Sequence, residues 1–194
     1  MGGDRGSPSD AKPWRLFVAA DVPEAVRSLL AGVLEPLRES HPELRWSPPE
    51  NWHVTLKFLG AVRPSLVADA GHAVAEAAAT TGRFDTHLLG ADAFPSARRA
   101  RVLWVGMSDP DDRFRALAGA LDIALERIVK PEERPFTPHL TVARAKQPLP
   151  LGEDLAAVAG TRSEAFTVDQ VTLYRSHLRR PAPLYEPVET FSLG

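Results

Sequence analysis

The spacing of apolar residues predicts a strand followed by a helix, twice along the chain. Residues 15–19 and 101–105 are short, almost wholly apolar runs, which is typical of buried strands. Apolar residues then recur at helical spacing over residues 26–37 and again over residues 114–128. The change from strand-like apolar runs to helical spacing indicates a protein that combines strands with helices.

The ends of both predicted helices carry sequence signals. Asp21 and Glu24 form a capping-box pattern before the first helix, and Asp111 or Asp112 is expected to start the second. Pro36 lies inside the first apolar stripe, where the missing N–H and the ring are expected to kink or shorten the helix.

Two longer strands are expected at residues 52–60 and 139–145, each preceded by a Pro-rich turn. The order β-α-β-α-β, found twice, predicts an α+β fold with two pseudo-symmetric lobes. We expect an antiparallel-rich sheet with helices in each lobe, because no Gly-rich phosphate loop follows the first strand as it would in a parallel nucleotide-binding fold. The remaining expected elements are helices over 64–80 and 153–158 and strands over 84–94, 166–174 and 185–191.

The spacing within the two halves is the same. His53 follows Arg15 by 38 positions, and His139 follows Arg101 by 38 positions. A constant offset from first strand to histidine indicates an internal repeat, over about residues 14–95 and 100–192. We therefore expect a single domain over residues 14–194. It follows a disordered Gly/Ser/Pro/Asp-rich tail over residues 1–13.

Composition narrows the possible classes of function. A chain of 194 residues with 44% hydrophobic and 25% charged residues fits a soluble globular protein. The absence of cysteine excludes thiol catalysis, disulfides and cysteine–zinc sites, and it suits the cytoplasm, where we expect the protein. No apolar run is long enough to span a membrane, and no signal peptide is seen, so no membrane partner is expected. The net charge of −2 argues against wholesale coating of nucleic acid, although a local basic patch could still hold an RNA end.

Each of the two longer strands begins with the tripeptide His-x-Thr. In a strand, residues i and i+2 point to the same face, so His53 shares a face with Thr55 and His139 shares one with Thr141. If the lobes are related by a pseudo-twofold axis, the two pairs face one another across a cleft between the lobes. One His-x-Thr tripeptide would mean little, but two at equivalent positions of a repeat indicate a site.

This arrangement suits hydrolysis of a cyclic phosphodiester. An in-line displacement needs a base for the attacking water and an acid for the leaving ribose oxygen, on opposite sides of phosphorus. Histidine can serve in either role near neutral pH. Threonine hydroxyls can donate to the phosphate oxygens where charge develops. This chemistry requires no cofactor and no metal; a zinc site on the two histidines would want a third ligand, which neither motif strand supplies.

The motifs resemble a known family. His53-Val54-Thr55-Leu56-Lys57-Phe58-Leu59-Gly60 and Pro138-His139-Leu140-Thr141-Val142-Ala143-Arg144 are similar to the paired motifs of the 2H phosphoesterases. Within these, the resemblance is to the RNA 2′,3′-cyclic phosphodiesterases, also called 2′-5′ RNA ligases, and it covers nearly all of residues 14–194.

The resemblance implies a substrate and a set of roles. The substrate would be RNA with a 2′,3′-cyclic phosphate end, such as a tRNA fragment, or a small cyclic nucleotide, opened to a 2′-phosphomonoester. The resemblance also implies reversible 2′-5′ RNA ligation without ATP. His53 would be the proton donor and His139 the acceptor, an assignment that the residues themselves leave open. The alternatives are a 2H enzyme acting on another cyclic or 2′-5′-linked nucleotide, and a non-catalytic module that binds RNA ends.

Several further residues are candidates for binding substrate. The resemblance implies a phosphate contact for Arg144, but simple alternation places Arg144 opposite His139 unless the strand ends or bulges first. Phe136 is the preferred residue for stacking a base, whereas Phe17 and Phe58 are expected in the core. We expect a monomer, because a chain that builds its own pseudo-symmetric site has no need of a partner subunit. The expected basic rim consists of Arg134 and Arg175, with Lys146, Arg179 and Arg180.

Overall fold

The structure is a computed structural model that describes residues 12–194. The tail expected over residues 1–13 therefore lies outside the described residues, apart from its last two. The described elements follow the expected order of strands and helices. The helices are α1 (Glu24–Ser40), α2 (Val67–Ala79), α3 (Arg113–Ala124) and α4 (Gly152–Val158), with 3-10 turns η2 (Pro49–Asn51), η3 (Pro64–Leu66) and η4 (Ala97–Arg99). The strands are β1 (Trp14–Asp21), β2 (Arg45–Trp46), β3 (His53–Val62), β4 (Phe84–Thr86), β5 (Leu88–Phe94), β6 (Ala100–Met107), β7 (His139–Leu149), β8 (Phe166–Val168), β9 (Gln170–His177) and β10 (Leu184–Ser192).

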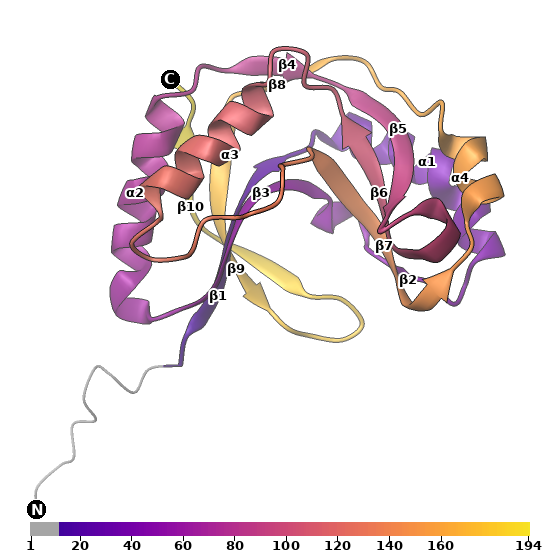
Figure 1. Cartoon of the computed structure of the whole chain (residues 1–194), viewed down its shortest axis with the longest axis horizontal. Helices are drawn as coiled ribbons and strands as arrows, with labels where there is room; N and C mark the ends of the chain where they lie inside the picture. The colour runs from indigo at the N-terminus through magenta and orange to yellow at the C-terminus, as the bar shows by residue number, and fades with distance from the viewer. Residues whose placement is uncertain (1–11) are drawn as a thin grey trace, which may run out of the picture.

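One long sheet runs through both lobes, in the order β10-β9-β1-β3-β7-β6-β5, with β2 added to β7. Its neighbouring strands are antiparallel, and so is the separate pair of β4 and β8. The α+β class with antiparallel sheets is thus confirmed. The two lobes join where β3 meets β7, so the motif strands lie at the centre of the sheet (Figure 1).

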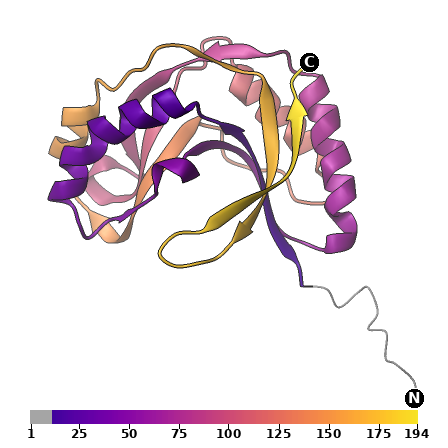
Figure 2. The same ribbon diagram turned by 180° about the vertical axis from the view of Figure 1, so that it is seen from behind.

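The lobes are not the two halves of the sequence. The first lobe holds β1, β3, β9 and β10 with helices α2 and α3, and the second holds β5, β6, β7 and β2 with α1 and α4. Figures 1 and 2 show these two groups on opposite sides of the junction. Helix α1 therefore belongs to the second lobe although it follows β1, and α3 belongs to the first although it follows β6. Each half of the chain contributes to both lobes, which holds them together.

Helices α1 and α3 begin close to the expected residues, but the expected aspartates do not cap them with their side chains. The carboxylate of Asp21 caps no helix; it accepts hydrogen bonds from the hydroxyls of Tyr174 (2.7 Å) and Thr172 (3.3 Å) on β9. Helix α3 starts directly after Asp112, as expected, but the backbone N–H of Phe114 donates to the Asp109 carboxylate at 2.9 Å and not to Asp111 or Asp112. In both cases a tertiary or loop contact outcompetes the expected local cap.

Helix α1 continues past Pro36 to Ser40. Leu34 and Leu37, on either side of the proline, are both buried in the core. Their packing holds the helix together where local propensity alone would end it. Within residues 12–194, no helix is both long enough and apolar enough to cross a membrane.

Candidate active site

Strands β3 and β7 pair at Val54 and Leu140, the middle residue of each His-x-Thr motif. Antiparallel pairing centred on these residues places Thr141 on the side of His53 and Thr55 on the side of His139. The four side chains flank one residue pair, and alternation puts all four on the same face. We call this the motif face. The two motifs therefore meet edge to edge within one sheet.

The two histidine rings are held in the same way. His53 Nδ1 lies 2.8 Å from the carbonyl oxygen of Asn51, and His139 Nδ1 lies 2.7 Å from that of Thr137. A carbonyl oxygen can only accept, so Nδ1 carries a proton in both rings. In each neutral ring Nε2 is then the free, basic nitrogen. Both histidines are thus fixed in the tautomer that an acid–base pair needs.

Aromatic rings pack around both imidazoles. Phe17 is stacked on His53 with the ring centroids 4.9 Å apart, and Tyr185 meets the same ring edge-on at 5.2 Å. On the other side, Phe94 meets His139 edge-on at 5.2 Å, and Trp104 lies 5.7 Å away. These contacts fix the orientation of each ring and shield it from water.

Burial lowers the pKa of both histidines. Loss of solvent lowers the pKa of His53 to about 4, against the opposing effects of the Asn51 carbonyl and the Asp21 carboxylate. Burial also lowers the pKa of His139, and the positive charge of Arg144 lowers it further. A positive charge on His139 lowers the pKa of His53 further, because like charges repel. Both shifts favour the neutral form of the ring at neutral pH.

A β-bulge follows each motif at the same position. In the pairing with β1, Thr55 lies opposite Ala19 and Lys57 lies opposite the adjacent Val18. Leu56 therefore has no partner and is the extra residue. In the pairing with β6, Thr141 lies opposite Trp104 and Ala143 lies opposite the adjacent Leu103. Val142 is therefore the extra residue. An extra residue reverses the alternation of a strand. The two strands accordingly share the burial pattern in which two successive residues are buried and the next is exposed.

The bulges bring Phe58 and Arg144 to the motif face. Phe58 is 65% exposed, so the expectation that it belongs to the core is wrong, whereas Phe17 is buried as expected. Arg144 meets the condition set by the sequence, because Val142 bulges before it. Its charge lowers the pKa of His139 and counteracts the rise in the pKa of Tyr185 caused by burial. The arginine therefore lies close to both the second motif and Tyr185.

The other expected substrate-binding residues lie in different surroundings. Arg134 is exposed and pairs with Glu132 at 3.1 Å. The Arg175 guanidinium lies 3.9 Å from the centre of the Trp14 ring and also 3.9 Å from Glu186. Phe136 is partly buried and packs against the core. The structure thus brings Arg144 to the histidines and engages Arg134 and Arg175 with other partners.

A buried ion pair links the first motif to the segment before the second. Because of the bulge, Lys57 points inward, where its ammonium pairs with Asp122 on α3 and donates to the carbonyl of Lys130 at 3.0 Å. Its side chain is almost fully buried. The sequence offered no sign of this, because a lysine beside a phenylalanine in a strand does not reveal an inward orientation.

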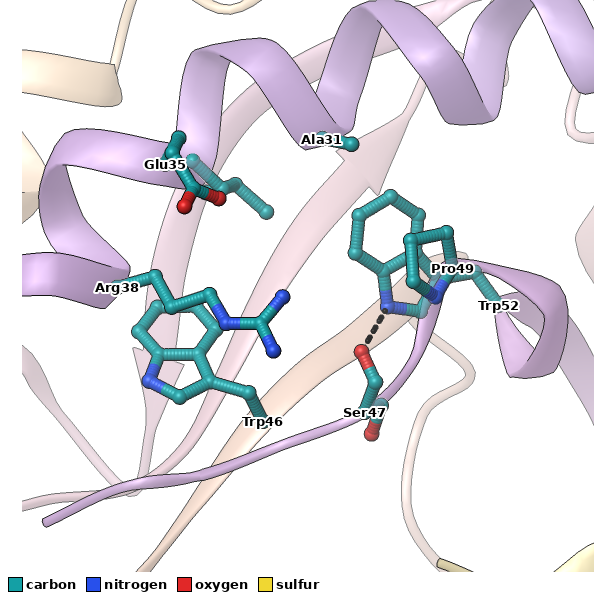
Figure 3. A pocket seen from close by; sticks show the side chains of 8 residues that line it. Ala31, Glu35, Arg38, Trp46, Ser47, Pro49 and Trp52 are labelled. Carbon is teal, nitrogen blue, oxygen red and sulfur yellow. Dashed lines mark hydrogen bonds between the residues drawn. The ribbon is translucent and has the colours of Figure 1, made fainter. Parts of the chain in front are cut away.

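The hollow beneath α1 in Figure 3 lies where the segment before His53 is hydrogen-bonded to β7. Trp52 Nε1 donates to the carbonyl of Ser47 at 3.1 Å, and the Ser47 amide donates to the carbonyl of Val142 at 2.8 Å. These bonds tie the segment before His53 to the bulge of β7. No motif residue lines the hollow. It is lined by Ala31, Leu34, Glu35, Arg38, Trp46, Ser47, Pro49 and Trp52.

In the part of the chain that the structure describes, no three histidine, aspartate or glutamate side chains gather in a way that could hold a metal ion. The hydroxyls of Thr55 and Thr141 have no side-chain hydrogen bond within residues 12–194, so they are free to donate to a ligand. The motif face thus presents two oriented imidazoles, two hydroxyls, a guanidinium and an exposed aromatic ring.

Known proteins are similar in sequence over most of the length of this chain. An RNA 2′,3′-cyclic phosphodiesterase of Methanothermobacter thermautotrophicus is 31% identical over 182 residues, which is 92% of this chain and 98% of that protein. One of Thermus thermophilus is 32% identical over 191 residues, covering 92% and 90%.

Solved structures share the fold. The crystal structure of the Thermus thermophilus protein TT0787 has a TM-score of 0.74 and 28% identity, covering 92% of this chain and 97% of that one. Escherichia coli LigT complexed with 3′-AMP has a TM-score of 0.69 and 30% identity, covering 93% and 98%. Residues 17–180 match the family profile of the 2′-5′ RNA ligase superfamily. With its two histidine motifs at the centre of that fold, the chain belongs to the 2′-5′ RNA ligase superfamily, a group of 2H phosphoesterases.

Proposed function

We propose that this protein hydrolyses terminal 2′,3′-cyclic phosphodiesters of RNA to 2′-phosphomonoesters by acid–base catalysis with His53 and His139. The observation that carries the proposal is that each imidazole donates Nδ1–H to a backbone carbonyl, which leaves both Nε2 atoms for proton transfer. The names of the relatives, RNA 2′,3′-cyclic phosphodiesterase, support the same substrate class.

In this mechanism, His53 Nε2 protonates the leaving 3′-oxygen of the ribose and His139 Nε2 takes the proton from the attacking water. The bound phosphodiester anion raises the pKa of the buried His53, because an opposite charge favours the protonated ring. This step is needed, because burial lowers the pKa of His53 to about 4 in the free protein. Substrate binding therefore brings His53 into the protonated form that a general acid requires.

The remaining groups of the motif face hold the substrate. Thr55 and Thr141 donate to the two non-bridging oxygens of the phosphate, where negative charge grows. Arg144 neutralises the same group from beyond the second motif. Phe58 provides an exposed ring on which the terminal base stacks. Phe136, the residue preferred from the sequence for this role, is held against the core.

The same pair of histidines can also join two RNA ends. If the 5′-hydroxyl of a second RNA replaces water, His139 takes its proton, His53 protonates the leaving 3′-oxygen, and a 2′-5′ linkage forms from the cyclic end without ATP; the reverse reaction, in which the roles exchange, restores the cyclic end. A small cyclic nucleotide or a tRNA fragment would present the same phosphate to the motif face. We expect the protein to act as a monomer, which light scattering of the purified chain measures directly.

The proposal is tested with an oligonucleotide that ends in a 2′,3′-cyclic phosphate, incubated in excess chelator. We expect a 2′-phosphate product from the wild type and a loss of roughly 10²–10⁴-fold in rate for His53→Ala and for His139→Ala. An intact cyclic end after incubation with the wild type, or full activity in either variant, would refute the proposal. Activity that needs an added metal would point instead to the zinc alternative.

A further inference from the structure

The hairpin between β9 and β10 projects from the first lobe (Figures 1 and 2). The hairpin is anchored at the site close to its turn, because Tyr185, the second residue of β10, meets the His53 ring edge-on at 5.2 Å and packs against Phe17 at 5.0 Å. Its turn, residues 178–183, reaches beyond these contacts. The hairpin is thus an arm attached to one of the two catalytic rings.

Asn51 fastens this arm to the residue before the first motif. Its side-chain Nδ2 donates to the carbonyl of Pro183 at 2.9 Å, across 132 positions of sequence. Its own carbonyl accepts from His53 Nδ1 at 2.8 Å. One residue therefore orients the catalytic ring with its backbone and holds the arm with its side chain.

The turn of the arm carries unpaired positive charge. Leu178 is 75% exposed, and Arg179 and Arg180 beside it are also exposed. Within residues 12–194 neither arginine takes part in an ion pair. Glu186, the acidic residue of the hairpin nearer to the turn, is engaged by His177 at 2.6 Å and by Arg175 at 3.9 Å. The two guanidinium groups are therefore free for an external anion.

We propose that the β9–β10 arm binds the RNA strand next to the cyclic end, with Arg179 and Arg180 contacting backbone phosphates and Asn51 holding the arm in place. This rests on the proposed function, since the cyclic phosphate must lie between His53 and His139 for the adjoining nucleotides to reach the arm. Phosphates of a single strand bind arginine without regard to sequence. The arm would make the protein prefer the end of an RNA chain to a free cyclic nucleotide.

The test compares two substrates, a 2′,3′-cyclic mononucleotide and an oligoribonucleotide with the same cyclic terminal nucleotide. For Arg179→Ala/Arg180→Ala, we expect the preference in kcat/KM for the oligonucleotide to fall by about tenfold at low salt. The log–log dependence of oligonucleotide affinity on salt should become shallower by roughly 1.4, or about 0.7 for each lost phosphate contact. Arg83→Ala/Arg162→Ala is the matched control. It removes the same charge next to β4 and before β8, on the edge of the molecule away from the arm (Figure 1).

Asn51→Ala tests the attachment of the arm separately, because it keeps the carbonyl that orients His53 and removes only the bond to Pro183. It should also lower the preference for the oligonucleotide, with both arginines still present. An unchanged preference and salt dependence in Arg179→Ala/Arg180→Ala, or an equal change in the control, would overturn the proposal. Fluorescence anisotropy measures the affinity of the wild type and of both double variants for the oligonucleotide without turnover. The loss of affinity should be confined to Arg179→Ala/Arg180→Ala. A wild type that binds RNA through the arm but opens neither substrate would refute the proposed function alone.

Discussion

Val54 and Leu140 pair across β3 and β7, and each is the central residue of its own His-x-Thr motif. A rotation that exchanges these two residues also exchanges His53 with His139 and Thr55 with Thr141. The internal repeat is therefore expressed as local symmetry about one residue pair at the centre of the sheet. This places a proton-transfer group on each side of a phosphate bound over that pair, as an in-line displacement requires.

The proposed roles of the two histidines predict different responses to the leaving group. p-Nitrophenolate leaves without being protonated, so a p-nitrophenyl phosphodiester needs no general acid. His53→Ala should recover most of its lost turnover on this substrate, whereas His139→Ala, which lacks the base, should remain slow. Release of p-nitrophenolate measures both directly. Recovery in His139→Ala and none in His53→Ala would reverse the assignment.

The buried state of His53 predicts a loss of stability in acid. In the unfolded chain its pKa returns to the ordinary value of 6.5, while in the folded protein it is about 4. Between these values the unfolded state binds more protons, so the free energy of unfolding falls as the pH drops from about 6.5 towards 4. Urea unfolding at several pH values should show a smaller decrease for His53→Gln than for the wild type. Parallel curves would contradict the depressed pKa.

Arg144→Ala should weaken catalysis and raise the pKa of His139, because the charge of Arg144 helps to lower it. We expect a loss in kcat/KM corresponding to roughly 1.5–3 kcal/mol, the range of a hydrogen bond to a charged group. Arg144→Lys keeps the charge but not the bidentate geometry, and should retain the low pKa with only part of the activity. NMR titration of His139 and steady-state kinetics measure the two effects. An unmoved His139 pKa in Arg144→Ala would show that the arginine lies elsewhere in solution.

Phe58→Ala should weaken binding of the terminal nucleotide, because base stacking on an aromatic ring contributes about 1–3 kcal/mol. The loss should be seen in KM more than in kcat, since the ring does not touch the reacting atoms. Phe58→Tyr keeps the aromatic face and should restore the wild-type KM. The folded state should be little affected by either change, because the ring is largely exposed. A normal KM in Phe58→Ala would exclude the stacking role.

Lys57→Met should destabilise the fold, because it leaves Asp122 without the charge that it faces. Breaking a buried ion pair costs about 3–5 kcal/mol, and we expect the lower end because Asp122 is partly exposed. Lys57→Met/Asp122→Leu removes both charges and should regain much of the stability. Denaturant unfolding of the three proteins is the measurement. Similar stability of the wild type and Lys57→Met would show that the pair contributes nothing.

The sequence alone determined the order of strands and helices, the repeat, the two histidine motifs and the face that each histidine shares with its threonine. These features depend on residues close together in the chain, so periodicity and spacing reveal them. For Arg144, the sequence already showed that it reaches the face of His139 only if the strand ends or bulges first. The extra residue Val142 provides that bulge.

Only the tertiary structure decided how the halves combine. Nothing in the local pattern shows that α1 and α3 each pack with the other lobe, that Lys57 turns inward to Asp122, or that Tyr185 and Pro183 return to His53 and Asn51. The burial of Phe58 was misjudged for the same reason, because one bulged residue reverses which side chains face the core. Contacts between distant segments decide these features, and they also determine the pKa values of the two histidines on which the proposed chemistry depends.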